Sequence, residues 1–206
     1  MNKVILHCDM DNYYASVECI DKPFLRLSPL AVCGDPDLRH GIVLAKNNHA
    51  KKYGVITGET IYQAKSKCPG LVILKPDYPK YLEYAKLARK IYSGFSDKVY
   101  PYGLDEAWIN LSGVCQNIQE GVEIAERIKK EIFSNLNLTI SIGVSFNYVY
   151  SKLASDMNKP NSITIIPSNI LAIFKLEALI LTEDIKNVIP AIDKATNNDS
   201  IATFTR

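Results

Sequence analysis

The chain has 206 residues, of which 47% are hydrophobic and 22% charged, a composition that excludes extensive disorder and predicts one domain, or one with an insertion. Its net charge of +2 is weak evidence for a nucleic-acid partner. There is no run of about 18 apolar residues to span a membrane, and the five cysteines form no C-x-x-C pair that would indicate zinc or disulfides. We therefore expect a cytoplasmic protein that has no membrane partner.

The first predicted element is a buried strand that contains the apolar run 4–6 and ends near Asp9. Ligands of layered α/β folds collect at the carboxyl ends of such strands. Asn12 is of a type that caps helices, so we expect it to begin a short helix with Tyr13 in its first turn.

Residues 20–77 contain only short predicted elements, which indicates a small subdomain inserted after the first helix. Six lysines against a single acid, Glu59, lie between positions 46 and 75, so this region is suited to face phosphates. Gly54 ends one of its helices and Thr60 caps the next. The expected strands are 30–33, 41–45 and 71–74, and the expected helices are 46–53 and 61–67.

The second half of the chain alternates longer helices with strands. Asp77 opens a helix that we expect at about 78–96, a second helix is expected at about 117–133, and a hairpin lies between them. A strand, a helix and a last strand follow, at 138–144, 148–157 and 162–166. This order predicts an α+β fold in which helices pack on one face of a sheet. Pro167 is the clearest boundary, and an acidic tail with apolar helical pieces at 170–181 and 185–189 follows it.

Three carboxylates form the candidate chemical centre. Asp105 and Glu106 lie at the tip of the hairpin within residues 99–111, and they would meet Asp9 if the two strands pair. Carboxylates in such close contact need cations, and an all-oxygen ligand set favours magnesium or manganese. The arrangement fits two-metal phosphoryl or nucleotidyl transfer, in which the backbone carbonyl of Met10 can also serve as a ligand. Spacing alone leaves open a solvated hairpin tip and a strand-end cap.

Three motifs carry a resemblance to a known family. The segments CDMDNYYASVE, GLDEAWINLS and SIGVSFNYVYSKLASDMNKPN, in this order and spacing, resemble the palm of the Y-family DNA polymerases of the UmuC/DinB translesion type. The resemblance covers roughly residues 1–166. It implies a ferredoxin-like, mostly antiparallel palm from residues 1–19 and 78–166, inserted fingers at 20–77, and a partial or divergent thumb-like tail at 167–206.

The resemblance implies a template-directed DNA polymerase that adds a deoxynucleoside triphosphate to a primer 3′-hydroxyl. Asp9, Asp105 and Glu106 match the catalytic metal ligands, with Met10 contributing its backbone, and two magnesium ions, or manganese in their place, are the implied cofactors. The implied partners are primer–template DNA and the nucleotide, with a sliding clamp or SOS-type regulators as further candidates.

The residues that match nucleotide-binding positions come from three segments. Tyr14 falls at the steric-gate position, where a bulky ring rejects a 2′-hydroxyl, and the amides next to it form an anion site at a helix start. Two departures matter: Asn48 replaces a common tyrosine, and Lys51 replaces a common arginine and lacks its bidentate fork. The complete set is Asn12, Tyr13, Tyr14, Asn48, Lys51 and Lys159.

Two alternatives remain open. No glycine follows Gly143, so the glycine-containing helical hairpin of the family's thumb cannot be located. The chain would then be a truncated, non-catalytic palm-and-fingers module that binds nucleotide, DNA or a partner. The second alternative is a phosphoaspartyl hydrolase with Asp9 as nucleophile, which requires a parallel, Rossmann-like sheet.

Overall fold

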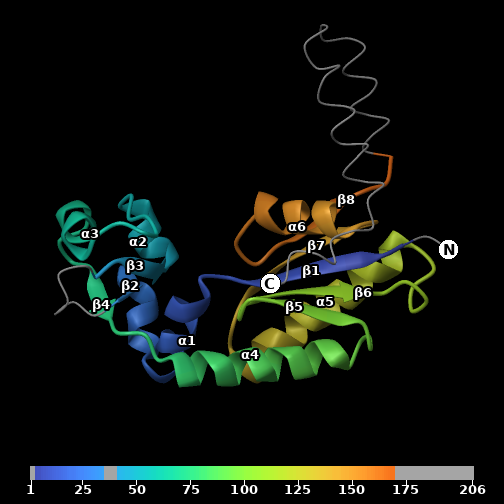
Figure 1. Ribbon diagram of the computed structural model, residues 1–206, viewed down its shortest axis with the longest axis horizontal. Coiled ribbons are helices and arrows are strands. Elements are labelled where there is room, and N and C mark those ends of the chain that lie inside the picture. Colours follow the sequence, from blue (N-terminus) through green and yellow to red (C-terminus); the bar gives the residue numbers. More distant parts are fainter. Residues whose placement is uncertain (1–2, 35–40, 170–206) are drawn as a thin grey trace, which may run out of the picture.

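The structure is a computed structural model that describes residues 3–34 and 41–169 (Figure 1). Within this part of the chain there are two β-sheets, one of five strands and one of three. No helix among the described residues is long and apolar enough to cross a membrane. The predicted tail helices at 170–181 and 185–189 lie outside the described residues.

The five-stranded sheet has β1 (Ile5–Met10) at its centre, and its strand order is β5-β6-β1-β7-β8. β1 pairs antiparallel with both neighbours, and only β7 and β8 run parallel. This mostly antiparallel sheet confirms the predicted α+β class and excludes the parallel sheet that a phosphoaspartyl hydrolase needs. The other strands are β5 (Val99–Tyr102), β6 (Glu106–Asn110), β7 (Ile140–Ser145) and β8 (Ile163–Ile166).

Helices cover both faces of this sheet, which corrects the expectation of one covered face. α4 (Tyr78–Ser93) and α5 (Ile118–Leu136) pack on the face where Leu6 and Cys8 of β1 join the main hydrophobic core. α6 (Tyr148–Met157) lies on the opposite face, where its Ser155 hydrogen-bonds to His7 of β1 (Figure 1). Every residue of β1 is therefore buried.

Gly143 of β7 explains how closely α6 approaches the sheet. A Cβ atom at this position would overlap the carbonyl oxygen of Ser151 in α6. The missing side chain therefore lets the backbone of the helix lie directly on the strand.

The three-stranded sheet has the order β3-β2-β4 and is built entirely from residues between α1 (Tyr13–Asp21) and α4. α1 connects the two sheets: Tyr13 and Val17 belong to the core of the larger sheet, whereas Ala15 and Cys19 pack against the smaller one. The remaining elements are η1 (Pro23–Leu27), β2 (Leu30–Cys33), β3 (Val43–Lys46), α2 (Asn48–Lys52), α3 (Ile61–Lys67) and β4 (Val72–Leu74).

Local signals placed the starts of α3, α4 and α5 to within one residue, whereas α4 ends at Ser93 and α5 at Leu136, three residues from the expected ends at 96 and 133. The side chains of Asp77, Asn117 and Thr60 accept the backbone hydrogen bonds expected of N-caps. Two expectations are wrong. Asn12 makes no capping bond and has a left-handed backbone with φ of 49°, and Lys46 ends strand β3 instead of beginning a helix. The five cysteines are buried and unpaired.

Candidate active site

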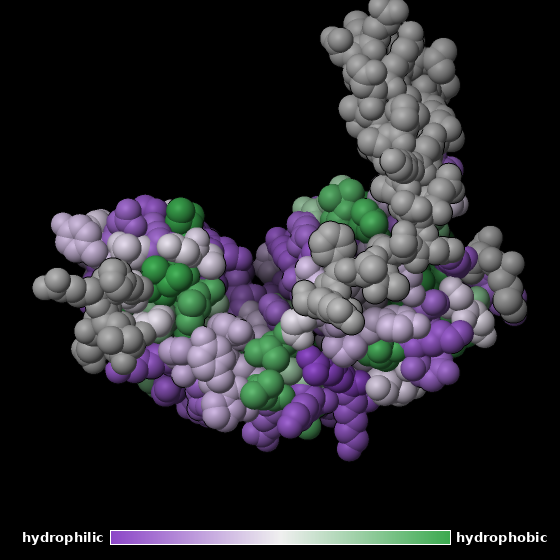
Figure 2. Space-filling view, in the orientation of Figure 1, coloured by the Kyte–Doolittle hydropathy of each residue, from purple (hydrophilic) through white to green (hydrophobic). Residues whose placement is uncertain are grey.

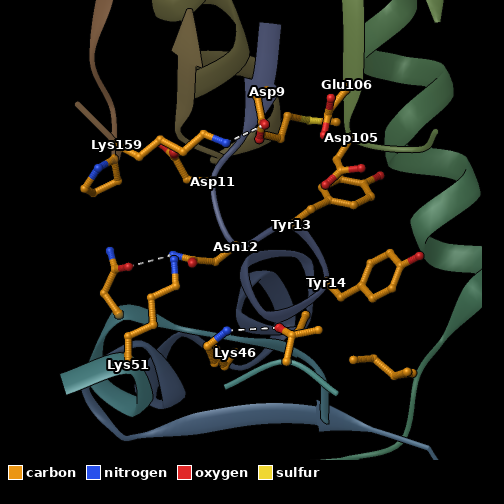
Figure 3. A pocket seen from close by; sticks show the side chains of 16 residues that line it. Asp9, Asp11, Asn12, Tyr13, Tyr14, Lys46, Lys51, Asp105, Glu106 and Lys159 are labelled. Carbon is orange, nitrogen blue, oxygen red and sulfur yellow. Dashed lines mark hydrogen bonds and ion pairs between the residues drawn. The ribbon is translucent and has the colours of Figure 1, made fainter. Parts of the chain in front are cut away.

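The three carboxylates lie at one end of the five-stranded sheet. β1 and β6 pair in a register that sets Asp9 opposite Glu106. Asp105 precedes Glu106 in the tight turn after β5, and its carbonyl accepts a hydrogen bond of 3.1 Å from the amide of Met10. The turn depends on Gly103, whose φ of 72° is readily adopted only by glycine. The pairing that was predicted to bring the three residues together is therefore present (Figure 3).

Lysines neutralise two of these carboxylates. Lys159 Nζ lies 2.5 Å from Asp9 Oδ2 and 2.6 Å from Asp156 Oδ1. Lys152 Nζ lies 2.5 Å from Glu106 Oε2, and the buried His7 contributes Nε2 at 3.1 Å from the same oxygen. The His7 contact lacks the geometry of a regular hydrogen bond, so Lys152 is the main partner of Glu106.

The pKa values separate the three groups. Burial, together with the charges of Asp9 and Glu106, raises the pKa of Asp105 to about 6. Burial also raises the pKa of Asp9, against the opposing effect of Lys159. For Glu106 burial is outweighed by His7 and Lys152, which lower its pKa to about 2. The ionisation of the Asp105 carboxyl group is therefore opposed by burial and by its two acidic neighbours.

The donor set fits a hard divalent cation, although the side chains are not arranged around one. Among residues 3–34 and 41–169, no three acidic, histidine or cysteine side chains surround a common point. Asp9 and Glu106 instead turn toward their lysines. A cation at this place would take over the neutralising role of Lys159 and Lys152, and oxygen donors of this kind suit magnesium or manganese.

A cleft of about 550 Å³ lies between the two sheets and opens over the carboxylates. Figure 2 shows the surface hollowed between the two lobes that the sheets form. Every residue predicted for the site lines this cleft, from both sides. They are Asp9, Met10, Asn12, Tyr13, Tyr14, Asn48, Lys51, Asp105, Glu106 and Lys159.

The start of α1 forms the floor of the cleft. Tyr14 stacks on Tyr81 of α4, with ring centroids 4.3 Å apart and planes inclined by 10°. Tyr13 is buried and donates a hydrogen bond from its hydroxyl to the carbonyl of Tyr81. The ring of Tyr13 is thereby held in the core, whereas Tyr14, which also lines the cleft, is only half-buried.

The three-stranded sheet and α2 supply positive charge opposite the carboxylates. Lys46 Nζ donates to Thr57 Oγ1 at 2.9 Å, and its pKa is lowered by partial burial and by the charge of Lys51. Asn48 accepts a hydrogen bond of 3.2 Å from the side chain of Asn12, which joins the two sides of the cleft.

Sequence reasoning missed several residues of this region. Lys46 lies two positions after Leu44 in β3, so strand alternation would have placed both on the face that lines the cleft. Asp11, Thr57 and Pro160 also line it. No local pattern indicates that Lys152 contacts Glu106, because the two residues come from different elements, α6 and β6.

Comparison with known proteins decides the family. Residues 8–156 match the impB/mucB/samB family, which is most of the chain. The chain belongs to this family. The predicted resemblance to the UmuC/DinB-type polymerases of the Y-family is thereby confirmed.

Individual relatives and solved structures of other proteins support the same family assignment. It is 51% identical over 169 residues to DNA polymerase IV of Acetivibrio thermocellus, covering 82% of this chain and 42% of that protein. It is 42% identical over 157 residues to DNA polymerase IV of Protochlamydia amoebophila, covering 76% and 45%. Among solved structures, an insertion ternary complex of Dbh DNA polymerase matches with a TM-score of 0.79 at 27% identity, over 83% of this chain and 51% of that one. DinB from Sulfolobus solfataricus matches with a TM-score of 0.78 at 27% identity, over 83% and 50%.

This family member spans less than half the length of these two relatives. What the whole relatives do is therefore not transferred to it by likeness alone.

Proposed function

We propose that this chain carries the nucleotidyl-transfer centre of a template-directed DNA polymerase of the translesion type. The observation that carries the proposal is the cleft between the two sheets, where three carboxylates on one side face lysines on the other. A deoxynucleoside triphosphate complexed with metal is complementary to such a cleft, since its phosphates need cations and its metals need oxygen donors.

The carboxylates and one backbone group would hold the metals. Asp9, Asp105 and Glu106, with the carbonyl of Met10, are the candidate ligands of two magnesium ions. When bound, these ions would activate the primer 3′-hydroxyl and offset the negative charge that develops on the phosphates. In the reaction the 3′-oxygen forms a bond to the α-phosphorus, and the bond to the leaving pyrophosphate breaks.

The remaining residues would bind and orient the nucleotide. Lys159, which now pairs with Asp9, would bind the triphosphate, and Lys51 would contact the phosphates from α2. The backbone amides of Asn12 and Tyr13, at the start of α1, would donate hydrogen bonds to the same triphosphate. Tyr14, braced by its stacking on Tyr81, excludes a 2′-hydroxyl.

The two sheets support a matching division of the chain. We assign residues 1–19 and 78–166 to the palm, 20–77 to the fingers and 167–206 to a thumb-like tail. Primer–template DNA would cross the cleft between palm and fingers. A sliding clamp, SOS-type regulators and a cytoplasmic location stay predictions.

A specific observation keeps the non-catalytic alternative in view: Asp9 and Glu106 are already ion-paired with lysines. A module that only binds nucleotide, DNA or a partner would keep these pairs permanently. The polymerase and the non-catalytic module differ in whether a metal ion can replace the lysines as the partner of Asp9 and Glu106.

Single-nucleotide primer extension tests the proposal. The protein is mixed at low salt with magnesium, a primer–template and the complementary nucleotide, beside an Asp105→Ala variant. An Asp97→Ala variant is the matched control, because Asp97 is an exposed carboxylate at the other end of β5. We expect incorporation by the wild type and the control, and a loss of at least about a hundredfold in Asp105→Ala. Equal incorporation by all three, or none by a folded wild type, would reject the polymerase assignment.

A further inference from the structure

Asp11 is a buried acid beside the carboxylate cluster to which the proposed reaction gives no role. The residue is only 5% exposed, although it lines the cleft two residues after Asp9. A buried carboxylate is costly unless its oxygens are satisfied by hydrogen bonds. The partners of Asp11 therefore indicate what it is for.

Both carboxylate oxygens of Asp11 are engaged. Oδ1 accepts a hydrogen bond of 2.8 Å from Ser141 Oγ of β7, and Oδ2 accepts one of 2.8 Å from the backbone amide of Asn161. The amide of Asp11 itself donates to the carbonyl of Thr139 at 3.0 Å. Asp11 is thus fixed to the sheet from one side and holds a loop from the other, and neither oxygen is turned toward the metal ligands.

The loop that Asp11 holds is the one that carries Lys159. It connects α6 to β8, and Asn161 adopts a left-handed backbone with φ of 56°. Lys129 Nζ donates to the carbonyl of Asn161 at 2.7 Å, so the backbone of this residue is held at a second point, in the next peptide unit. Figure 3 shows Asp11 and Lys159 side by side at the mouth of the cleft.

We propose that Asp11 is a positioning residue that anchors the loop after α6 and thereby sets where Lys159 meets the triphosphate. A lysine side chain is long and flexible, so the place of its ammonium group depends on how firmly its backbone is held. A carboxylate bonded to a backbone amide is a charge-assisted contact, stronger than a neutral one. Anchoring of this kind raises affinity by reducing the ordering required on binding. The inference rests on the proposed function.

The test is a double-mutant cycle between Asp11 and Lys159. Asp11→Asn keeps the size of the side chain but removes its charge, so the hydrogen bond from the amide of Asn161 is no longer charge-assisted. The KM for the nucleotide and kcat are measured by single-nucleotide incorporation for the wild type, Asp11→Asn, Lys159→Ala and the double variant. Affinity for a non-hydrolysable nucleotide is measured separately by titration, and Asp97→Asn serves as the exposed control.

We expect Asp11→Asn to raise the KM and the dissociation constant about tenfold, with a smaller change in kcat. In the Lys159→Ala background the same substitution should change KM less than about twofold, because the group that it positions is gone. A purely structural role for Asp11 would give the same effect in both backgrounds. That result, or an unchanged KM in Asp11→Asn, overturns the inference while leaving the role of Lys159 intact.

Failure of the proposed function has a different signature. If Lys159→Ala leaves both KM and nucleotide affinity unchanged, Lys159 does not bind the triphosphate. The inference that Asp11 positions it is then rejected as well. Melting temperatures show whether each variant folds. Should Asp11→Asn unfold, Ser141→Ala replaces it in the cycle, since it removes one support of the Asp11 carboxylate. It should raise KM in the same direction and lose that effect when Lys159 is absent.

Discussion

Asp105 and Glu106 are adjacent in the chain, yet their pKa values move in opposite directions. Burial and two neighbouring carboxylates raise the pKa of Asp105 to about 6, whereas His7 and Lys152 lower that of Glu106 to about 2 despite burial. Glu106 has the ammonium group of Lys152 in α6 and the imidazole of His7 in β1 beside it. At neutral pH both are ionised, so Asp105 carries a charge that the folded protein without metal opposes.

This difference predicts how stability responds to pH. The folded pKa of Asp105 is about 6 against an ordinary value of 3.8, so the folded state binds this proton more tightly than the unfolded state. The stability that results is complete below about pH 3.8 and is lost as the pH rises through about 6. Asp105→Asn removes this loss. In urea denaturation with a chelator, we expect the variant to gain free energy of unfolding relative to the wild type between about pH 4 and pH 7.

Asp97→Asn is the control for this measurement, since Asp97 is exposed and lies outside the cluster. Its difference from the wild type should stay constant over the same range of pH. Magnesium should reduce the advantage of Asp105→Asn at pH 7, because the cation stabilises only the ionised cluster. A difference for Asp105→Asn that does not vary with pH would show that its pKa is not raised.

At the scale of elements, α6 lies very close to β7 at Gly143. Among the described glycines, this is the position where an added Cβ atom would come closest to a neighbouring atom. α6 carries Lys152, and the loop after it carries Lys159, so the position of the helix over Gly143 also sets two cationic groups of the site. The close packing of α6 on β7 therefore fixes the positions of Lys152 and Lys159 at the cleft.

Gly143→Ala tests this close packing. Its added methyl group overlaps the backbone of α6, and neither partner can turn away as a flexible side chain would. We expect a loss of about 3 kcal/mol or more of unfolding free energy. Gly70→Ala is the matched control, because a Cβ at Gly70 meets nothing within 4 Å, and it should be neutral or slightly stabilising. Chemical denaturation of both variants measures the difference. Equal stabilities would show that α6 lies farther from the sheet.

The sequence predicted those elements whose signals are local. Asp77, Asn117 and Thr60 cap helices through neighbours three residues away, so their positions could be inferred. Asn12 could not, because the chain around it is held by distant groups: the amide of Met10 bonds to the carbonyl of Asp105. That constraint favours a left-handed turn over the expected cap.

Local sequence patterns also could not predict which face of the five-stranded sheet α6 covers. A helical stripe shows which face of a helix is buried, but not which side of a sheet receives it. Motif resemblance supplied the predicted site residues, all of which line one cleft. It did not supply Lys152, because an ion pair between two elements leaves no pattern in either.

At the scale of the whole molecule, the cleft separates charge between the two sheets. The carboxylates belong to the five-stranded sheet, whereas Lys46 and Lys51 belong to the three-stranded sheet and the helix after it. A polyphosphate bound between them would hold the two lobes together by charge.

Substitution of Lys46 or Lys51 by alanine should therefore weaken nucleotide binding in a way that depends on salt. We expect KM to rise about three- to tenfold at low salt and the effect to shrink as salt screens the charge. Lys90→Ala removes the same charge from the exposed surface of α4 and should leave KM unchanged at all salt concentrations. Steady-state kinetics at several salt concentrations measure this. An equal effect of Lys90 would mean that net charge, not the cleft, is responsible.

The central place of β1 has a consequence for synthesis on the ribosome. β1 precedes the other described strands in the chain, but its partners are β6 and β7, which end at Asn110 and Ser145. Asp9 can therefore reach its final surroundings only after residue 145 has left the exit tunnel, and contacts so distant in sequence form slowly. Until then the apolar residues of β1 lack one of their two neighbouring strands. We expect nascent chains that stop short of β7 to depend on chaperones.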